Sequence, residues 1–298
     1  MWFGKNGDRS GPALVLSGGG SMGALQAGIL RALVRRGLQP SRIVGTSVGA
    51  LNGAFLAFHP GEEGLERLAQ AWRALGSEHY IRANPVRVAY RLARRQRCLF
   101  SNDFLRELIA EHTVEDDFAA ARVPLHVTAT NLTTGKKHVF SEGPISQAVL
   151  ASAAIPGVFA PVEIDGESYI DGGVVAHLDL DTAVDEGSKE ILAIDLSHCF
   201  EEPEPRSVIG VISRTVDIVM RDRVERDMAR LRRKARITLI QPEIREGHGV
   251  GDLSQATRLL ELGETLAEQF AEQCFDKRGR IRPGVVSATP PLPEEQAS

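Results

Sequence analysis

Cysteines and long apolar runs are scarce in this chain. Its three cysteines, Cys98, Cys199 and Cys274, are odd in number and widely spaced, so they offer neither a disulfide framework nor a Cys-x-x-Cys metal site, and buried thiols are expected. Every apolar run falls short of the about eighteen residues of a membrane span, and residues 1–10 lack the apolar core of a secretory signal. The sequence therefore predicts neither a membrane span nor export, and a cytoplasmic location.

An excess of charge of either sign is also missing. The chain has 35 Lys and Arg against 39 Asp and Glu, a net charge of −4, so no global basic field favours nucleic acid as a partner. What the chain does have is 43% hydrophobic residues over 298 positions, which is enough to bury a sizeable core and excludes disordered and collagen-like classes.

Short apolar runs alternate along the chain with longer helical patterns. Strands are expected over residues 13–16, 42–44, 125–130, 138–140, 162–164, 168–170, 191–196 and 237–240. Helices are expected over residues 22–36, 48–58, 65–74, 103–111, 207–234 and 254–275. This alternation predicts an α/β fold with a central, mainly parallel sheet.

Three segments carry further predictions. Residues 276–298 lack apolar periodicity, so a poorly ordered tail is predicted after a single domain of residues 1–275. Residues 207–234 are predicted to pack in the core, with a dimer contact as the alternative, and the oligomeric state stays open. Residues 82–97 combine six arginines with apolar residues and no acid, as in a basic helix that docks on anionic lipid or in a solvated helix face.

A glycine-rich loop, Gly18-Gly19-Gly20-Ser21-Met22-Gly23, joins the first expected strand to the first helix. It fits the Gly-x-Gly-x-x-Gly pattern of dinucleotide-binding turns, but those also need an acidic residue about twenty positions later, and none occurs between Asp8 and Glu62. The loop is therefore interpreted as a row of backbone N–H groups suited to a developing negative charge. No cofactor is predicted, and no metal-binding motif is present.

A second motif, Gly45-Thr46-Ser47-Val48-Gly49, lies between a short strand and an apolar helix. The Gly-x-Ser-x-Gly pattern at such a junction is typical of a nucleophile elbow, in which flanking glycines allow the sharp turn that exposes the serine hydroxyl. Because consecutive β-α units end at the same sheet edge, the two glycine motifs can be neighbours. Ser47 is the predicted nucleophile, with a capping serine in a tight turn as the structural alternative.

A serine nucleophile needs a base, and three candidates stay open. His198 and His248 are placed late enough in the chain for a Ser-His arrangement, but neither stands in a motif. Asp171 is followed by Gly172 and Gly173, directly after a hairpin predicted at Asp165-Gly166. A second Asp-Gly pair at that place favours close approach of the backbone to a site.

In this order the three motifs resemble those of the patatin-like phospholipases, lipid acyl hydrolases with a Ser-Asp dyad. The resemblance extends over about residues 13–263 and includes the blocks 131–135 and 151–159. It implies a three-layer α/β/α fold, Ser47 as nucleophile, Asp171 as general base, and an oxyanion hole from Gly18, Gly19 and Gly20. The implied partner is a lipid or fatty-acyl ester of the phospholipid or lysophospholipid type. Peripheral contact at the inner face of a membrane is expected if the basic segment 82–97 docks on lipid.

Two positions depart from the pattern of that family. Met22 stands where Arg or Lys is usual, and His177-Leu178-Asp179 stands where Asn-x-Pro is common. The head-group preference and the local geometry behind Asp171 are therefore left open. A catalytically idle lipid-binding or regulatory module on the same fold is the alternative function.

Overall fold

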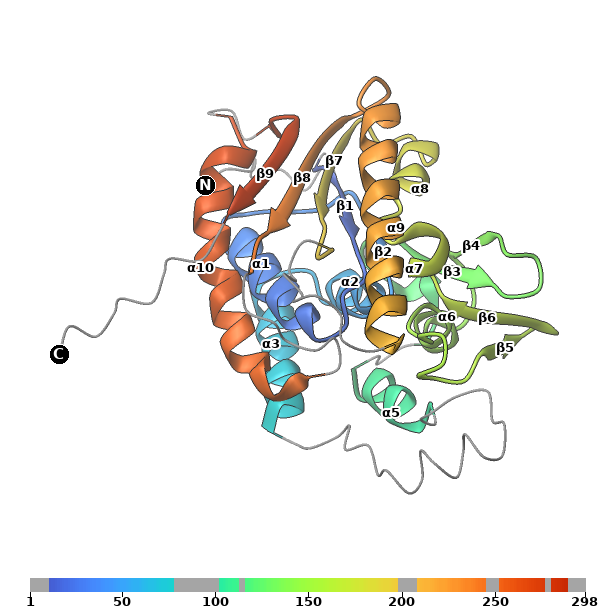
Figure 1. The fold of residues 1–298 in the computed structure, drawn as a ribbon. Helices are drawn as coiled ribbons and strands as arrows, with labels where there is room; N and C mark the ends of the chain where they lie inside the picture. Colours follow the sequence, from blue (N-terminus) through green and yellow to red (C-terminus); the bar gives the residue numbers. More distant parts are fainter. Residues whose placement is uncertain are drawn as a thin grey trace.

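A mixed β-sheet forms the centre of the molecule (Figure 1). The computed structural model describes residues 11–77, 102–112, 116–197, 208–244, 252–276 and 280–288. Within them the strand order is β5-β6-β3-β2-β1-β7-β8-β9, and β4 also pairs with β3. The bounds are β1 (Ala13–Leu16), β2 (Arg42–Thr46), β3 (Leu125–Asn131), β4 (Lys137–Phe140), β5 (Val162–Ile164), β6 (Glu167–Asp171), β7 (Glu190–Ile194), β8 (Arg236–Pro242) and β9 (Gly284–Ala288).

The strands from β3 to β9 in this order are parallel, whereas β4, β5 and β6 make the antiparallel pairs at one side. Each residue of β1 is fully buried, as expected for a parallel strand covered on both faces. Leu14 and Leu16 belong to one apolar core and Ala13 and Val15 to the other, so the two faces of the strand fill separate cores.

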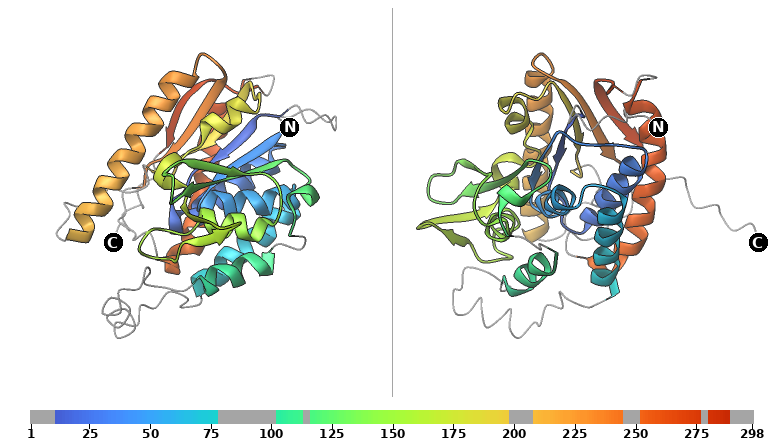
Figure 2. Two further views of the ribbon diagram at one scale, coloured as in Figure 1. Left: turned by 90° about the vertical axis from the view of Figure 1, so that its right-hand side faces the viewer. Right: turned by 180° about the vertical axis from the view of Figure 1, so that it is seen from behind.

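Helices cover both faces of the sheet, which gives the three-layer α/β/α fold that was predicted (Figure 2). One face carries α1 (Gly23–Arg35), α2 (Val48–Phe58), α3 (Glu62–Ser77), α6 (Ile145–Ser152) and α10 (Ala256–Cys274), and the other carries α8 (Leu180–Asp185) and α9 (Val208–Leu231). In the described part of the chain, the remaining helical segments are α5 (Asp103–His112), α7 (Gly173–Ala176) and three 3-10 turns at Gly20–Met22, Phe118–Ala120 and Leu253–Gln255.

The structure corrects the predicted tail. Gly284–Ala288, which lie within the segment expected to be poorly ordered, form β9 and pair in parallel with β8. Val286 and Ala288 are buried beside α10, whereas Val285 is 57% exposed. Five residues between proline-rich flanks are too few to give a clear periodic signal, and the pairing partner β8 is far away in the sequence.

The structure also corrects the predicted core packing of residues 207–234. In α9 the side chains of Val224 and Leu231, two helical turns apart, pack in the core. By contrast, Val211, Ile218 and Val219 are 51%, 54% and 58% exposed, because they lie off that contact face. The apolar residues of the segment are thus spread around the helix, and the first half of α9 presents an apolar surface to solvent.

The structure confirms two smaller predictions, the Asp165-Gly166 hairpin and the buried thiol of Cys274. The β5–β6 hairpin turns at Asp165 and Gly166, whose φ angles of 51° and 80° suit a type I′ turn. Cys274 is a buried thiol whose pKa is raised to about 12 by desolvation, whereas Cys98 and Cys199 fall outside the described residues, as does the arginine-rich segment 82–97. None of the described helices combines the length and apolar character that crossing a membrane requires.

Candidate active site

Ser47 sits on a strained turn between β2 and α2. Its backbone has φ 56° and ψ −125°, a left-handed conformation that costs a residue with a side chain about 1 to 3 kcal/mol. A Cβ added at Gly45 would lie 2.5 Å from the Gly49 carbonyl oxygen, and one added at Gly49 would lie 2.4 Å from the Leu16 carbonyl oxygen. Both flanking positions therefore require glycine, and the turn has the shape of a nucleophile elbow.

A buried serine on α6 holds this turn in place. The Ser47 amide donates a hydrogen bond of 2.8 Å to Ser152 Oγ, and that hydroxyl donates one of 2.6 Å to the Thr128 carbonyl oxygen on β3. Ser152 is fully buried. Ser152 belongs to the 151–159 block that carried the family resemblance. Nothing in the sequence of that block shows where the Ser152 hydroxyl points, so its support of the Ser47 turn was not predicted.

Asp171 lies in direct contact with Ser47, although 124 positions separate them. Ser47 Oγ donates a hydrogen bond of 2.6 Å to Asp171 Oδ2, and the Gly173 amide donates one of 2.7 Å to Oδ1. Asp171 is the last residue of β6 and stands opposite Ala129 of β3. A Cβ added at Gly172 would lie 2.2 Å from the Thr128 carbonyl oxygen, which explains why glycine follows the aspartate.

The surroundings of Asp171 make its carboxylate more basic than usual. Residues Ser47 and Asp171 are only 6% and 7% exposed. Burial raises the pKa of Asp171 to about 6, while the hydrogen bonds from Ser47 and Gly173 and the charge of His177 hold it down. Near neutral pH the group is thus ionised and yet able to accept a proton.

The glycine-rich loop lies directly beside the serine. A Cβ added at Gly18 would lie 3.2 Å from Ser47 Cβ. The Gly18 amide donates to the His177 carbonyl oxygen at 3.2 Å, so it is not free to bind an oxyanion in this conformation. No residue of the described part of the chain accepts a hydrogen bond from the Gly19 or Gly20 amide. Of the three backbone amides predicted to form the oxyanion hole, only those of Gly19 and Gly20 stay candidates.

His198 and His248 both fall outside the described residues. The structure instead brings a different histidine, His177, next to the Gly18 loop, where its side chain is 8% exposed. Its signal in the sequence was the departure from Asn-x-Pro after the Asp171 motif.

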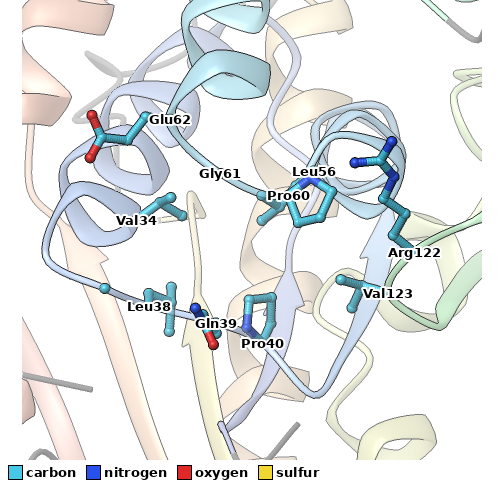
Figure 3. A pocket seen from close by; sticks show the side chains of 11 residues that line it. Val34, Leu38, Gln39, Pro40, Leu56, Pro60, Gly61, Glu62, Arg122 and Val123 are labelled. Atoms are coloured by element: carbon cyan, nitrogen blue, oxygen red, sulfur yellow. The ribbon is translucent and has the colours of Figure 1, made fainter. Parts of the chain in front are cut away.

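Among the residues that the structure describes, no group of three or more His, Cys, Asp or Glu side chains is placed to hold a metal ion. A cavity of about 470 Å³ is lined in part by Val34, Leu38, Leu56, Arg122 and Val123 (Figure 3). Leu38 precedes β2 and Val123 precedes β3, whereas Ser47 follows β2. The cavity is therefore at the opposite end of these strands from the serine.

A serine on a strand-to-helix elbow, hydrogen-bonded to a buried carboxylate beside a glycine loop, is an arrangement typical of serine hydrolases. The family model described as patatin-like phospholipase matches residues 14–184. The chain belongs to this family.

Curated relatives agree with this assignment. An uncharacterized NTE family protein of Mycobacterium tuberculosis is 31% identical over 186 residues, which cover 62% of this chain and 49% of the relative. Patatin-like phospholipase domain-containing protein 7 of Rattus norvegicus is 30% identical over 62% of this chain and 13% of its own length, and lysophospholipase NTE1 of Mycosarcoma maydis is 27% identical over 67% and 10%. The match thus spans about half of the mycobacterial protein and a small part of the eukaryotic ones.

Two solved structures that align with this chain are more distant in sequence. VipD from Legionella pneumophila aligns with 88% of this chain and 67% of its own, at 16% identity and a TM-score of 0.47. The effector ExoU aligns with 87% of this chain and 53% of its own, at 16% identity and a TM-score of 0.37.

Proposed function

We propose that the chain is a serine acyl hydrolase that cleaves fatty-acyl esters of phospholipids, lysophospholipids or related lipids. The observation that carries the proposal is the 2.6 Å hydrogen bond from Ser47 Oγ to Asp171 Oδ2 inside a nearly buried site. Membership of the patatin-like phospholipase family and the lysophospholipase among the relatives support a lipid ester as substrate.

The first half of the proposed reaction forms an acyl-enzyme. Ser47 Oγ attacks the ester carbonyl carbon while Asp171 Oδ2 accepts the hydroxyl proton. The Gly19 and Gly20 amides donate to the oxyanion that develops on the carbonyl oxygen, and one such donor typically contributes about 3 to 4 kcal/mol to the transition state. As the ester C–O bond breaks, Asp171 returns the proton to the leaving alcohol oxygen.

The second half releases the fatty acid. Asp171 takes a proton from a water molecule, whose oxygen attacks the acyl carbon of the ester on Ser47. The bond to Ser47 Oγ then breaks, and the serine recovers the proton from Asp171. The same carboxylate thus serves as base and then as acid in each half, for which a pKa near neutrality is more effective than the ordinary value of 3.8.

The exposed part of α9 is the proposed contact with a lipid surface. It lies next to the site, since a Cβ added at Gly173 would be 3.0 Å from Asp171 Oδ1 and 3.3 Å from Met220 Cε. Val174, on the turn that follows Asp171, is 49% exposed, and Ile218 is 54% exposed. Exposed apolar side chains beside the site favour a water–lipid boundary, where substrate chains are found.

Hydrolysis by variants of the purified chain tests the proposal. Release of fatty acid is measured on phosphatidylcholine, lysophosphatidylcholine and p-nitrophenyl esters of increasing acyl length. Ser47→Ala and Asp171→Asn should each lose at least about a thousandfold in kcat/KM. The exposed residues Ser141 and Asp165 supply the controls Ser141→Ala and Asp165→Asn, which should keep the wild-type rate.

The same assay separates the alternatives. Liposome binding with no turnover of any ester would favour the catalytically idle lipid-binding module. Full activity of Asp171→Asn together with loss in His198→Ala or His248→Ala would favour a histidine base. Either result would contradict the Ser47–Asp171 mechanism.

A further inference from the structure

A chain of buried polar side chains runs from α3 to the glycine-rich loop of the proposed site. Its members are Gln26 on α1, Asn52 on α2 and Trp72 on α3, three helices that pack against one another. Gln26 and Asn52 are fully buried, and Trp72 is 3% exposed. Burying an amide is costly unless its polar atoms find partners, so the partners of these side chains indicate what the chain serves.

The indole fixes the order of the hydrogen bonds in this chain. Trp72 Nε1 can only donate, and it donates to Asn52 Oδ1 at 3.0 Å. Asn52 Nδ2 then donates to Gln26 Oε1 at 3.0 Å and to the Gly23 carbonyl oxygen at 2.9 Å. Gln26 Nε2 donates in turn to the Ser17 carbonyl oxygen at 3.3 Å. Each amide thus accepts on the side of Trp72 and donates on the side of the glycine loop.

The two carbonyl groups that accept from this chain flank the glycine loop. Ser17 directly precedes the loop, and Gly23 is its last glycine. The Ser17 hydroxyl also takes part, because it accepts from the Leu196 amide at 2.9 Å and donates to the Gly18 carbonyl oxygen at 2.8 Å. Side chains therefore hold the loop at both of its ends.

Packing at Gly23 joins the loop to the nucleophile elbow. A Cβ added at Gly23 would lie 2.2 Å from Val48 Cγ2 and 2.6 Å from Trp72 Cζ2. Val48 directly follows Ser47, so Gly23 packs against both the elbow and the indole. Oxyanion donors act only within a narrow range of distances, so a shift of this end of the loop would weaken them.

We propose that Trp72, Asn52 and Gln26 are positioning residues of the site: their hydrogen bonds fix both ends of the glycine loop, so that its amides are in place for the oxyanion before the substrate binds. The inference rests on the proposed function, because it concerns the oxyanion hole of that reaction. The three side chains act through the backbone of the loop. Donors that are held in place in advance need no reorganisation in the transition state.

Two substitutions break the chain at different points. Asn52→Leu keeps the size of the side chain and removes its hydrogen bonds, and Trp72→Phe keeps an aromatic ring and removes the indole donor. Each should lower kcat on p-nitrophenyl butyrate about tenfold and change KM less than twofold. The double variant should add little to either single change, because both break the same chain. The acid limb of the pH profile should not move, since Asp171 keeps its surroundings.

Butylboronic acid distinguishes this role from a general loss of the site. Boron accepts the Ser47 oxygen while Asp171 takes the hydroxyl proton, which gives a tetrahedral anion with an oxygen at the oxyanion position. The inhibition constant of butylboronic acid should rise about tenfold in both variants. The inhibition constant of p-nitrophenyl butyl ether, which has no carbonyl group, should stay within about twofold of the wild-type value.

Thr238 supplies the matched control. It is fully buried on β8, which β7 separates from β1, and its hydroxyl donates to the Arg282 carbonyl oxygen at 2.6 Å. Thr238→Val removes a buried hydrogen bond to a carbonyl group, as Asn52→Leu does, but away from the glycine loop. It should leave kcat and boronate inhibition unchanged. Urea unfolding checks that each variant is folded, and Trp72→Phe decides the test if Asn52→Leu does not fold.

The possible failures can be told apart. Unchanged kcat and boronate inhibition in the folded variants, with Ser47→Ala inactive, would refute the role of the chain and leave the proposed function standing. Equal weakening of boronate and ether inhibition would also refute it, because the damage would then not be specific to the oxyanion. If Ser47→Ala retains hydrolysis, the proposed function fails and the inference fails with it.

Discussion

Replacing Asp171 by asparagine should make the protein more stable while removing its activity. The carboxylate is buried, and its pKa is about 6 in the folded chain against an ordinary value of 3.8. The two pKa values differ by about 2, and each pKa unit corresponds to about 1.4 kcal/mol. Keeping the buried carboxylate ionised therefore lowers the free energy of unfolding by about 3 kcal/mol. An asparagine can still accept from Gly173 and donate toward Ser47, so Asp171→Asn should recover most of that cost at neutral pH.

The sign of this effect depends on pH. Because the folded-state pKa of Asp171 is raised above its unfolded value, the native state binds this proton more tightly than the unfolded state does. The resulting stabilisation of the wild type is fully present below about pH 4 and is lost as pH rises through about 6. The gain from Asp171→Asn should therefore be close to zero at pH 4 and reach about 3 kcal/mol at pH 7.5.

Urea unfolding at pH 4, 5, 6 and 7.5 measures this difference, with Asp165→Asn as an exposed control that should show no such trend. A variant that is equally or less stable than the wild type at pH 7.5 would refute the reasoning. A gain of the same size at every pH would also refute it, because the cost would then not come from ionisation.

Three further predictions concern the reaction and its surface. The acid limb of kcat/KM in the wild type should report an apparent pKa near 6, and a limb near 4 would show that Asp171 is not the base. Ser152→Ala should lower the free energy of unfolding by about 1 to 3 kcal/mol and also lower kcat, because the Ser47 amide and the Thr128 carbonyl lose their partner. Unchanged thermal unfolding and kcat would show that the turn needs no such support. Ile218→Glu should slow hydrolysis of phospholipid vesicles severalfold and leave the rate on p-nitrophenyl butyrate unchanged, whereas the control Val285→Glu, at an exposed position of β9, should change neither rate. An equal loss of rate on both substrates in Ile218→Glu would argue against a lipid contact at α9.

The elements that local patterns encode were predictable from the sequence. The apolar runs of β1, β2, β3 and β8 and the Gly-x-Ser-x-Gly turn at Ser47 carry their own signals, and the structure has a strand or elbow at each. Asp171 could be selected as a candidate base because two glycines follow it. A hairpin turn did not explain these glycines, since Asp165-Gly166 already supplied that turn. Its contact with Ser47 required only that β2, β3 and β6 be neighbours in one sheet.

The features that were missed depend on contacts between distant segments. Ser152 supports the elbow only because α6 packs against β3, and the His177 side chain lies beside Gly18 although the two residues are far apart in the sequence. The exposure of Ile218 follows from which side of α9 meets the sheet, and composition alone does not specify that side. In each case the side chain is ordinary in sequence and acquires its role from the tertiary arrangement.

The most direct test of the account is the identity of the residue that becomes acylated. Purified wild-type chain is treated with a fluorophosphonate, and the adduct is located by peptide mass spectrometry. The account predicts one adduct, on Ser47, that is absent in Ser47→Ala and present in Ser141→Ala. An unmodified Ser47, or equal labelling of Ser47→Ala, would contradict it.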